Sequence, residues 1–178
     1  MANSGKVEMS TIPSEDSGTY GWESVVHFGS LAVILVLVVA GVLGFLGIRN
    51  SSATASGNGL SLTVDHASIT RPGLATPFAL VIESTDGSPL PPLLTTRVDS
   101  AYLAMFDENG LDPDPVSSFQ SKVWTWWEFE VPEGASLLEV SFDARLEPAV
   151  QTGRSATAAV EVDGSEATAV DFTTWVLP

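Results

Sequence analysis

Hydrophobic and polar positions follow different patterns in the two parts of this chain. Residues 31–48 (LAVILVLVVAGVLGFLGI) are uncharged and apolar apart from three glycines. At about 1.5 Å per residue, such a run gives roughly 27 Å of helix, which is enough to cross the hydrocarbon core of a bilayer. A helix on the surface of a soluble domain would show a polar face, and this run has none. Together with the apolar residues Val25, Val26 and Phe28, the pattern predicts a transmembrane helix over 25–48.

From residue 59 onward, apolar and polar residues alternate with a period of two, as in antiparallel strands with one face on a core and one in water. The clearest case is 138–146, where Leu, Val, Phe, Ala and Leu alternate with Glu, Ser, Asp and Arg. Seven segments qualify as strands: 60–69, 78–83, 97–106, 123–131, 138–146, 158–163 and 170–176. Turn signals such as Asp86-Gly87 and Asp163-Gly164 separate them. The pattern predicts an all-β domain over 59–178, an immunoglobulin- or fibronectin-like antiparallel β-sandwich of about seven strands.

The segments that flank the apolar run have no sustained periodicity. Residues 1–24 are rich in Ser, Gly and acidic side chains, which predicts a disordered acidic tail. Residues 49–58 (RNSSATASGN) have the composition of a flexible linker. The expected order is therefore tail, helix, linker and β-sandwich.

The apolar run is interpreted as a retained signal-anchor, with a cleaved signal peptide as the alternative. Ala53-Thr54-Ala55 offers a cleavage pattern. However, the run is longer than the 7–15 residues usual for a signal peptide, and an acidic rather than basic segment precedes it. Lys6 before the helix and Arg49 after it give no orientation by the positive-inside rule. Because the Ser/Thr-rich β domain has the character of an exported domain, we expect it on the extracytoplasmic side of a plasma membrane.

The charge and the absence of cysteine narrow the possible functions. The formal net charge is -15, and residues 49–178 carry six basic against eighteen acidic side chains. So acidic a domain repels phosphate backbones and anionic headgroups, which argues against nucleic-acid binding. Without cysteine the chain has no disulfide, thiolate metal site or thiol nucleophile.

Catalytic patterns are missing from the sequence, and we expect no enzyme. His66 is the single histidine after the apolar run, and its neighbour Asp65 would face the opposite side of a strand. The sequence contains neither a G-x-S-x-G elbow nor a glycine-rich phosphate loop.

An acidic segment at 107–115 (DENGLDPDP) is the candidate metal site. Asp107, Asn109, Asp112 and Asp114 supply the hard oxygen ligands that calcium prefers. The segment does not fit an EF-hand, because Asp112 occupies the sixth position where glycine is required. Asn-Gly and Asp-Pro pairs are also common in solvated turns, which is the alternative interpretation.

Two features suggest contacts with other proteins. Gly41, Gly44 and Gly47 recur at every third position and could form a helix-packing face, although glycine is frequent in membrane helices. In 123–131 (VWTWWEFEV), alternation places Trp124 and Trp126 on the outer face of the sandwich. Exposed tryptophans there would suit a membrane or protein contact. The alternative is that the segment 107–122 covers them.

Four pieces of the sequence carry a resemblance to a known family. They are TRPGLATP at 70–77, FDENGLDP at 106–113, FDARLEP at 142–148 and DFTTWV at 171–176. Together they resemble an uncharacterised family of small actinobacterial single-pass membrane proteins, over most of residues 25–178. The resemblance implies an anchored extracytoplasmic β domain that associates with a multipass membrane protein, and it supplies no catalytic residues.

These observations favour a membrane-anchored extracytoplasmic interaction module, an accessory subunit of a membrane protein assembly that contacts the lipid bilayer and a multipass partner. The alternative is a calcium-dependent or cell-envelope ligand-binding domain that uses the acidic segment 107–114.

Overall fold

The computed structural model describes residues 20–42 and 47–177, and the chain divides into two units between Leu46 and Gly47. The first unit contains helix α1 (Tyr20–Val42), of which Gly21–Val42 is long and apolar enough to cross a membrane. The helix begins five residues before its expected start, so the assignment of 20–24 to a disordered tail is wrong. Glu23 lies in the first turn, where a carboxylate stabilises the positive end of the helix dipole.

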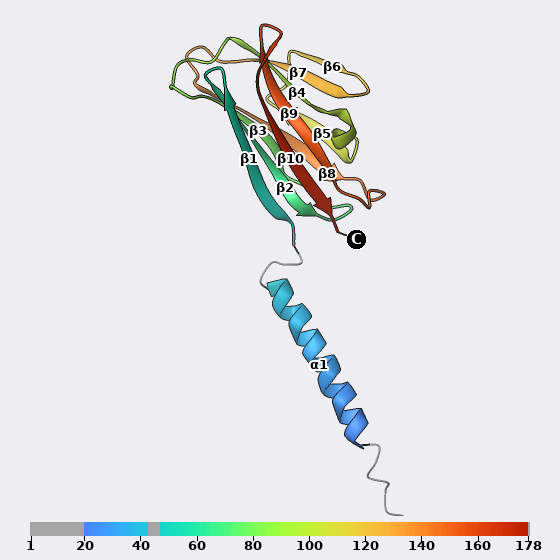
Figure 1. Cartoon of the computed structure of the whole chain (residues 1–178). Helices are drawn as coiled ribbons and strands as arrows, with labels where there is room; N and C mark the ends of the chain where they lie inside the picture. The colour runs from blue at the N-terminus through green and yellow to red at the C-terminus, as the bar shows by residue number, and fades with distance from the viewer. Residues whose placement is uncertain (1–19, 43–46, 178) are drawn as a thin grey trace, which may run out of the picture. The chain divides into compact units, whose positions relative to one another are not determined.

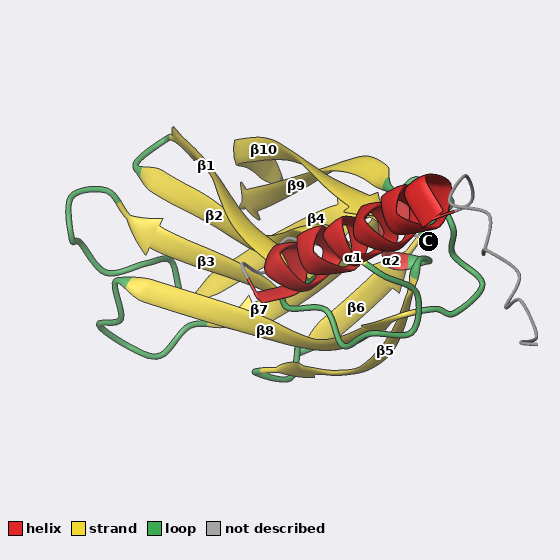
Figure 2. Ribbon diagram, turned by 90° about the horizontal axis from the view of Figure 1, so that it is seen from below, coloured by secondary structure: helices red, strands yellow, loops and turns green. Residues whose placement is uncertain are grey.

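The second unit is all-β apart from one short helix, as the alternating pattern predicted (Figures 1 and 2). Its strands are β1 (Arg49–Gly57), β2 (Leu60–Thr70), β3 (Phe78–Ser84), β4 (Leu93–Asp99), β5 (Phe106–Asp112), β6 (Ser117–Gln120), β7 (Trp124–Glu130), β8 (Leu137–Leu146), β9 (Arg154–Val162) and β10 (Ser165–Val176). Helix α2 (Ser100–Leu103) lies between β4 and β5. The expectation of about seven strands is wrong, because the described residues form ten.

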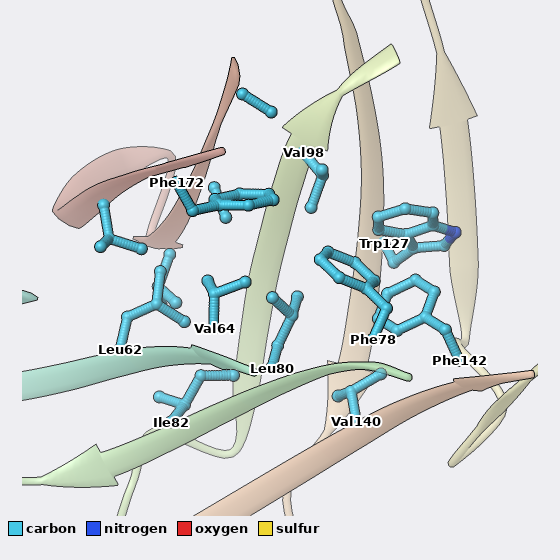
Figure 3. Packing of buried hydrophobic residues seen from close by; sticks show 14 of the residues in the cluster. Leu62, Val64, Phe78, Leu80, Ile82, Val98, Trp127, Val140, Phe142 and Phe172 are labelled. Atoms are coloured by element: carbon cyan, nitrogen blue, oxygen red, sulfur yellow. The ribbon is translucent and has the colours of Figure 1, made fainter. Parts of the chain in front are cut away.

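The strands make one continuous curled sheet in the order β5-β8-β3-β2-β10-β9-β4-β7-β6, with β1 also paired to β2. All pairings are antiparallel except that of β2 with β10, which joins Ile69 to Trp175 and Thr70 to Val176. This short parallel contact connects two antiparallel halves, which we call the β2 half (β1, β2, β3, β5, β8) and the β7 half (β4, β6, β7, β9, β10). Apolar side chains from both halves meet in one core (Figure 3).

The segment 49–58 is the clearest correction to the expected domain order. It was expected to be a flexible linker, but β1 pairs with β2 in a nearly continuous register from Arg49 to Gly57. Ala53 and Ala55 pack against the core, while Ser52, Thr54 and Ser56 point outward. The segment therefore alternates with a period of two like the other strands. Its apolar residues are so small that the composition resembles that of a linker.

Helix α2 interrupts the strand that was expected over 97–106. The Asp99 carboxylate accepts a hydrogen bond from the Ala101 backbone N–H at 2.8 Å, which caps the helix and ends β4. Tyr102 is fully buried, with its ring 4.9 Å from Phe172 and 5.5 Å from Phe78. Its hydroxyl lies 3.0 Å from the Thr174 hydroxyl. Burial raises the pKa of Tyr102 to about 12.

Candidate interaction surface

Strand β7 carries large aromatic side chains on both of its faces. Trp127 and Phe129 are buried in the core, where Trp127 lies 5.3 Å from the Phe142 ring. Trp124 and Trp126 point to the opposite side and are half-buried. The sidedness predicted from the alternation is confirmed.

Neighbouring strands of the same sheet cover part of both rings. The register places Trp126 between Arg97 of β4 and Phe119 of β6. The Phe119 and Trp126 ring centroids are 5.4 Å apart, and the Arg97 guanidinium carbon lies 4.6 Å from the Trp124 ring centroid. Phe119 belongs to the segment 107–122, so this segment does contact Trp126. However, Phe119 is itself 66% exposed, so the contact enlarges the aromatic surface.

Arg97 is held in place by two carboxylates as well as by the indole. Its Nη1 donates to Glu161 Oε1 at 2.7 Å, and its Nη2 donates to Glu166 Oε2. The three partners come from β7, β9 and β10, so the guanidinium connects the outer sides of several strands. A cation over an indole ring adds about 0.5–1 kcal/mol at an exposed site. We call Arg97, Phe119, Trp124 and Trp126 the aromatic surface.

A cavity of about 380 Å³ lies beside β6, next to the aromatic surface. Its walls come from helix α2 and from strands β5, β6 and β7. The lining residues are Leu103, Ala104, Phe106, Ser118, Phe119, Gln120, Thr125 and Trp127. Phe119 therefore borders both features, while Thr125 and Trp127 line the cavity from the face of β7 opposite to Trp124 and Trp126.

Phe119 and Arg97 are members of the surface that sequence reasoning missed. Strand β6 is only four residues long and fully exposed, so the sequence around Phe119 has no apolar alternation to mark it as a strand. Arg97 was placed in a strand, but its carboxylate partners lie 64 and 69 positions away in the sequence. Only the pairing of β4 with β9 brings Arg97 near Glu161.

The proposed glycine face of the helix is described only in part. Gly41 lies in the last turn of α1, and Gly44 lies outside the described residues. Gly47 forms a bend and Ile48 leads into β1, so the expectation that the helix extends to residue 48 is wrong. Closely spaced glycines weaken a helix because they lose the most backbone freedom on folding. Packing of another helix against Gly41 stays a prediction.

The acidic segment belongs to strand β5 as far as Asp112. Asp107 and Asp112 lie at opposite ends of β5, where they face Arg145 and Ser141 of β8. At about 3.4 Å per residue, the five steps between them separate their Cα atoms by up to about 17 Å. The register shifts at Asn109, whose side chain is not described, and Asp114 is exposed beyond the strand. Calcium binding by these four residues stays a prediction.

In the described part of the chain, no three His, Asp or Glu side chains are placed to share one metal ion. His66 is buried against the Phe172 ring at 5.1 Å, and its Nδ1 lies 3.3 Å from the Val64 carbonyl oxygen. Asp65 points outward, where its carboxylate accepts a hydrogen bond from Ser52. The prediction that His66 and Asp65 face opposite sides is confirmed.

No model of a known protein family matches the chain, and no curated protein matches it either. The resemblance to small actinobacterial membrane proteins therefore stays a prediction, and the functional argument rests on the surfaces described above.

Proposed function

We propose that the chain is a single-pass plasma-membrane protein whose extracytoplasmic β domain binds a multipass membrane protein as an accessory subunit. The observation that carries this proposal is the aromatic surface, in which Phe119 and Trp126 stack on the outer side of the sheet beside Arg97 and Trp124.

The composition of the aromatic surface suits a protein interface. Tryptophan and arginine are the residues that most often contribute large binding energies when they lie at the centre of an interface. Here the rings are already held by Arg97 and by each other, so binding would immobilise little additional side-chain freedom. Polar groups of Ser117 and Glu128 lie next to the rings and are joined by a hydrogen bond of 3.0 Å. A polar rim around an aromatic centre is typical of interfaces between folded proteins.

Membrane anchoring is proposed from the length and apolar character of α1. Its large side chains are exposed along the whole helix, including Leu31, Val36 and Val42. Exposed apolar surface of this extent is stable in lipid, and not in water. The extracytoplasmic position of the β domain, its immunoglobulin- or fibronectin-like character, and the absence of catalysis, of a cofactor and of nucleic-acid binding are parts of the same proposal.

The test is capture of the partner from native membranes in mild detergent, with an affinity tag on the amino terminus. A photo-crosslinking amino acid replaces Phe119 in one variant and Leu137 in the control. Leu137 is an exposed apolar residue at the start of β8, in the β2 half. We expect a crosslink to one multipass protein from position 119 and none from position 137.

A second pair of variants separates binding from folding. Phe119→Ser with Trp126→Ser removes the centre of the aromatic surface, whereas Leu137→Ser is the matched change elsewhere. We expect the first variant to abolish capture and the second to retain it. The β domain of both variants should still unfold in a cooperative thermal transition. Recovery of the protein alone, or equal capture by both variants, contradicts the proposal.

A further inference from the structure

The charged residues of the β domain are distributed unevenly between its two ends. In Figure 1, β1 begins and β10 ends at the same end of the domain. We call this the entry end, and define it as the two terminal residues, on that side, of β1, β2, β3, β5, β8, β9 and β10, together with the connections 71–77 and 147–153 and Leu177. Contacts that hold it together include Arg49 opposite Ile69, Arg154 opposite Thr174, Gly73 N–H donating to the Leu146 carbonyl, and Glu147 N–H donating to the Met105 carbonyl.

Most of the basic residues lie at the entry end. It holds four of the six that the domain contains: Arg49, Arg71, Arg145 and Arg154. Against them stand two acidic residues, Asp107 and Glu147. The rest of the domain carries Arg97 and Lys122 against sixteen acidic residues. The strongly acidic domain therefore has one end with an excess of positive charge.

Three arginines at this end, Arg71, Arg145 and Arg154, are available to bind an anion. The ion pairs that the described part of the domain shows for its arginines join Arg97 to Glu161 and Glu166, and involve none of these three. Arg145 uses its Nε to hold the Gly73 carbonyl at 2.8 Å and remains exposed. Arg154 is also exposed, at the start of β9. These guanidinium groups can therefore contact phosphate without first breaking an ion pair within the domain.

The entry end also exposes large apolar side chains. Trp175 is 65% exposed on β10, Leu74 is exposed in the connection between β2 and β3, and Leu177 is exposed after β10. Tryptophan favours the headgroup level of a bilayer, and arginine binds the phosphates of anionic lipids there. Basic and aromatic side chains on one surface are the combination that suits a lipid headgroup layer.

The connection to α1 limits how far the entry end can lie from the end of that helix. Six residues separate Val42 from Arg49, and seven virtual bonds of at most about 3.6 Å reach roughly 25 Å. Residues 49–57 belong to β1 and are paired with β2, so they do not lengthen this connection as a flexible linker would.

We propose that the entry end docks on an anionic lipid headgroup surface, with Arg71, Arg145, Arg154 and Trp175 as its contacts. The inference rests on the anchoring role proposed for α1. Docking holds the acidic opposite end away from the membrane, because that end is repelled by the same headgroups. It also fixes the height at which the aromatic surface meets a partner.

The test uses the whole chain in nanodiscs of neutral phosphatidylcholine, with or without phosphatidylglycerol. The chain has no cysteine, so a single introduced cysteine can carry a fluorescent dye. Thr152→Cys places the dye at the entry end and Ser136→Cys places it in the turn before β8, at the opposite end. With a quencher attached to the lipid headgroups, we expect the dye at 152 to be quenched at least about twofold more when phosphatidylglycerol is present. The dye at 136 should show no change.

A matched pair of charge variants tests which residues are responsible. Arg71→Ser with Arg154→Ser lowers the net charge by two at the entry end, and Ser136→Glu with Ser165→Glu does so at the opposite end. In the chain labelled at position 152, we expect the first pair to remove the dependence on phosphatidylglycerol. The second pair should retain it. Thermal melts verify that both variants fold.

The outcomes separate this inference from the proposed anchoring. A chain that enters nanodiscs but shows no quenching at position 152, or equal quenching with and without phosphatidylglycerol, overturns docking and leaves the anchor intact. Loss of the effect in both charge variants also overturns it, because total charge would then be responsible. A chain that does not enter nanodiscs overturns the anchor and the docking together.

Discussion

On the outer face of the β2 half, hydroxyl side chains pair between β1 and β2, whereas β6 and β7 of the other half carry aromatic rings beside one arginine. In the β7 half, outward hydroxyl pairing is found between β9 and β10, where Ser155 lies 2.8 Å from Thr173. Thr54 lies 2.9 Å from Thr63, and Ser56 donates to Ser61 at 3.2 Å. The inner faces of both halves are apolar and share one core. Burial therefore explains the inner residues of both halves, and cross-strand hydrogen bonds explain the outer residues of β1 and β2. Neither requirement explains exposed rings on β6 and β7, which is why we assign binding to that face.

The largest expected effect distinguishes the two faces of β7 itself. Trp127→Ala removes a buried ring from the core and should lower the free energy of unfolding by about 3–5 kcal/mol. Trp126→Ala removes a half-buried ring that stacks on Phe119, and should cost about 1 kcal/mol. Urea denaturation of residues 47–178 measures both. Every buried apolar residue of the core lies within this segment. Equal losses of unfolding free energy in the two variants would mean that Trp126 contributes to stability as much as Trp127. The two faces of β7 would then not differ in role.

A second, smaller effect concerns the core that the two halves share. Tyr102 has a raised pKa of about 12 when folded and about 10 when unfolded. Between these values the unfolded chain releases the phenolic proton while the folded chain retains it. Stability should therefore fall as the pH rises from about 10 to 12, by at most roughly 3 kcal/mol. Below pH 10 this group should contribute no pH dependence.

Tyr102→Phe is the control for this prediction. It removes the titrating group and the contact with the Thr174 hydroxyl, so it should cost about 1 kcal/mol near neutral pH and flatten the profile above pH 10. Tyr102 is the single tyrosine of residues 47–178, so tyrosinate absorbance reports its pKa directly. A pKa near 10 in the folded domain would show that the hydroxyl is solvated.

Strand β8 shows what the sequence could predict, and β1 and β6 show what it could not. In β8, large apolar residues alternate with charged ones, so the hydrophobic effect alone fixes which face is buried. In β1 the inward residues are alanines, and in β6 every residue is exposed, so neither leaves an apolar signal. The outward tryptophans were predicted from alternation within β7. Their partners Phe119 and Arg97 depend on long-range pairing, which one strand's sequence does not encode.

The smallest expected effects compare the outer faces of the two halves directly. Arg97→Gln leaves Glu161 and Glu166 close together without a cation and uncovers the Trp124 ring. Because Arg97 is mostly buried, we expect a loss of about 1–2 kcal/mol in unfolding free energy. Thr63→Val is the corresponding change on the β2 half. It removes the exposed contact with Thr54 and should change stability by less than about 0.5 kcal/mol.

Arg97→Lys sharpens this comparison, because it keeps the charge but loses the planar fork that donates to two carboxylates at once. If geometry is responsible, its stability should lie between those of the wild type and Arg97→Gln, and partner capture should fall as the Trp124 ring is released. Urea denaturation and the capture assay are performed on the same three proteins. Wild-type stability in Arg97→Gln would show that the two carboxylates tolerate each other, and the arginine would then have to be explained by binding alone.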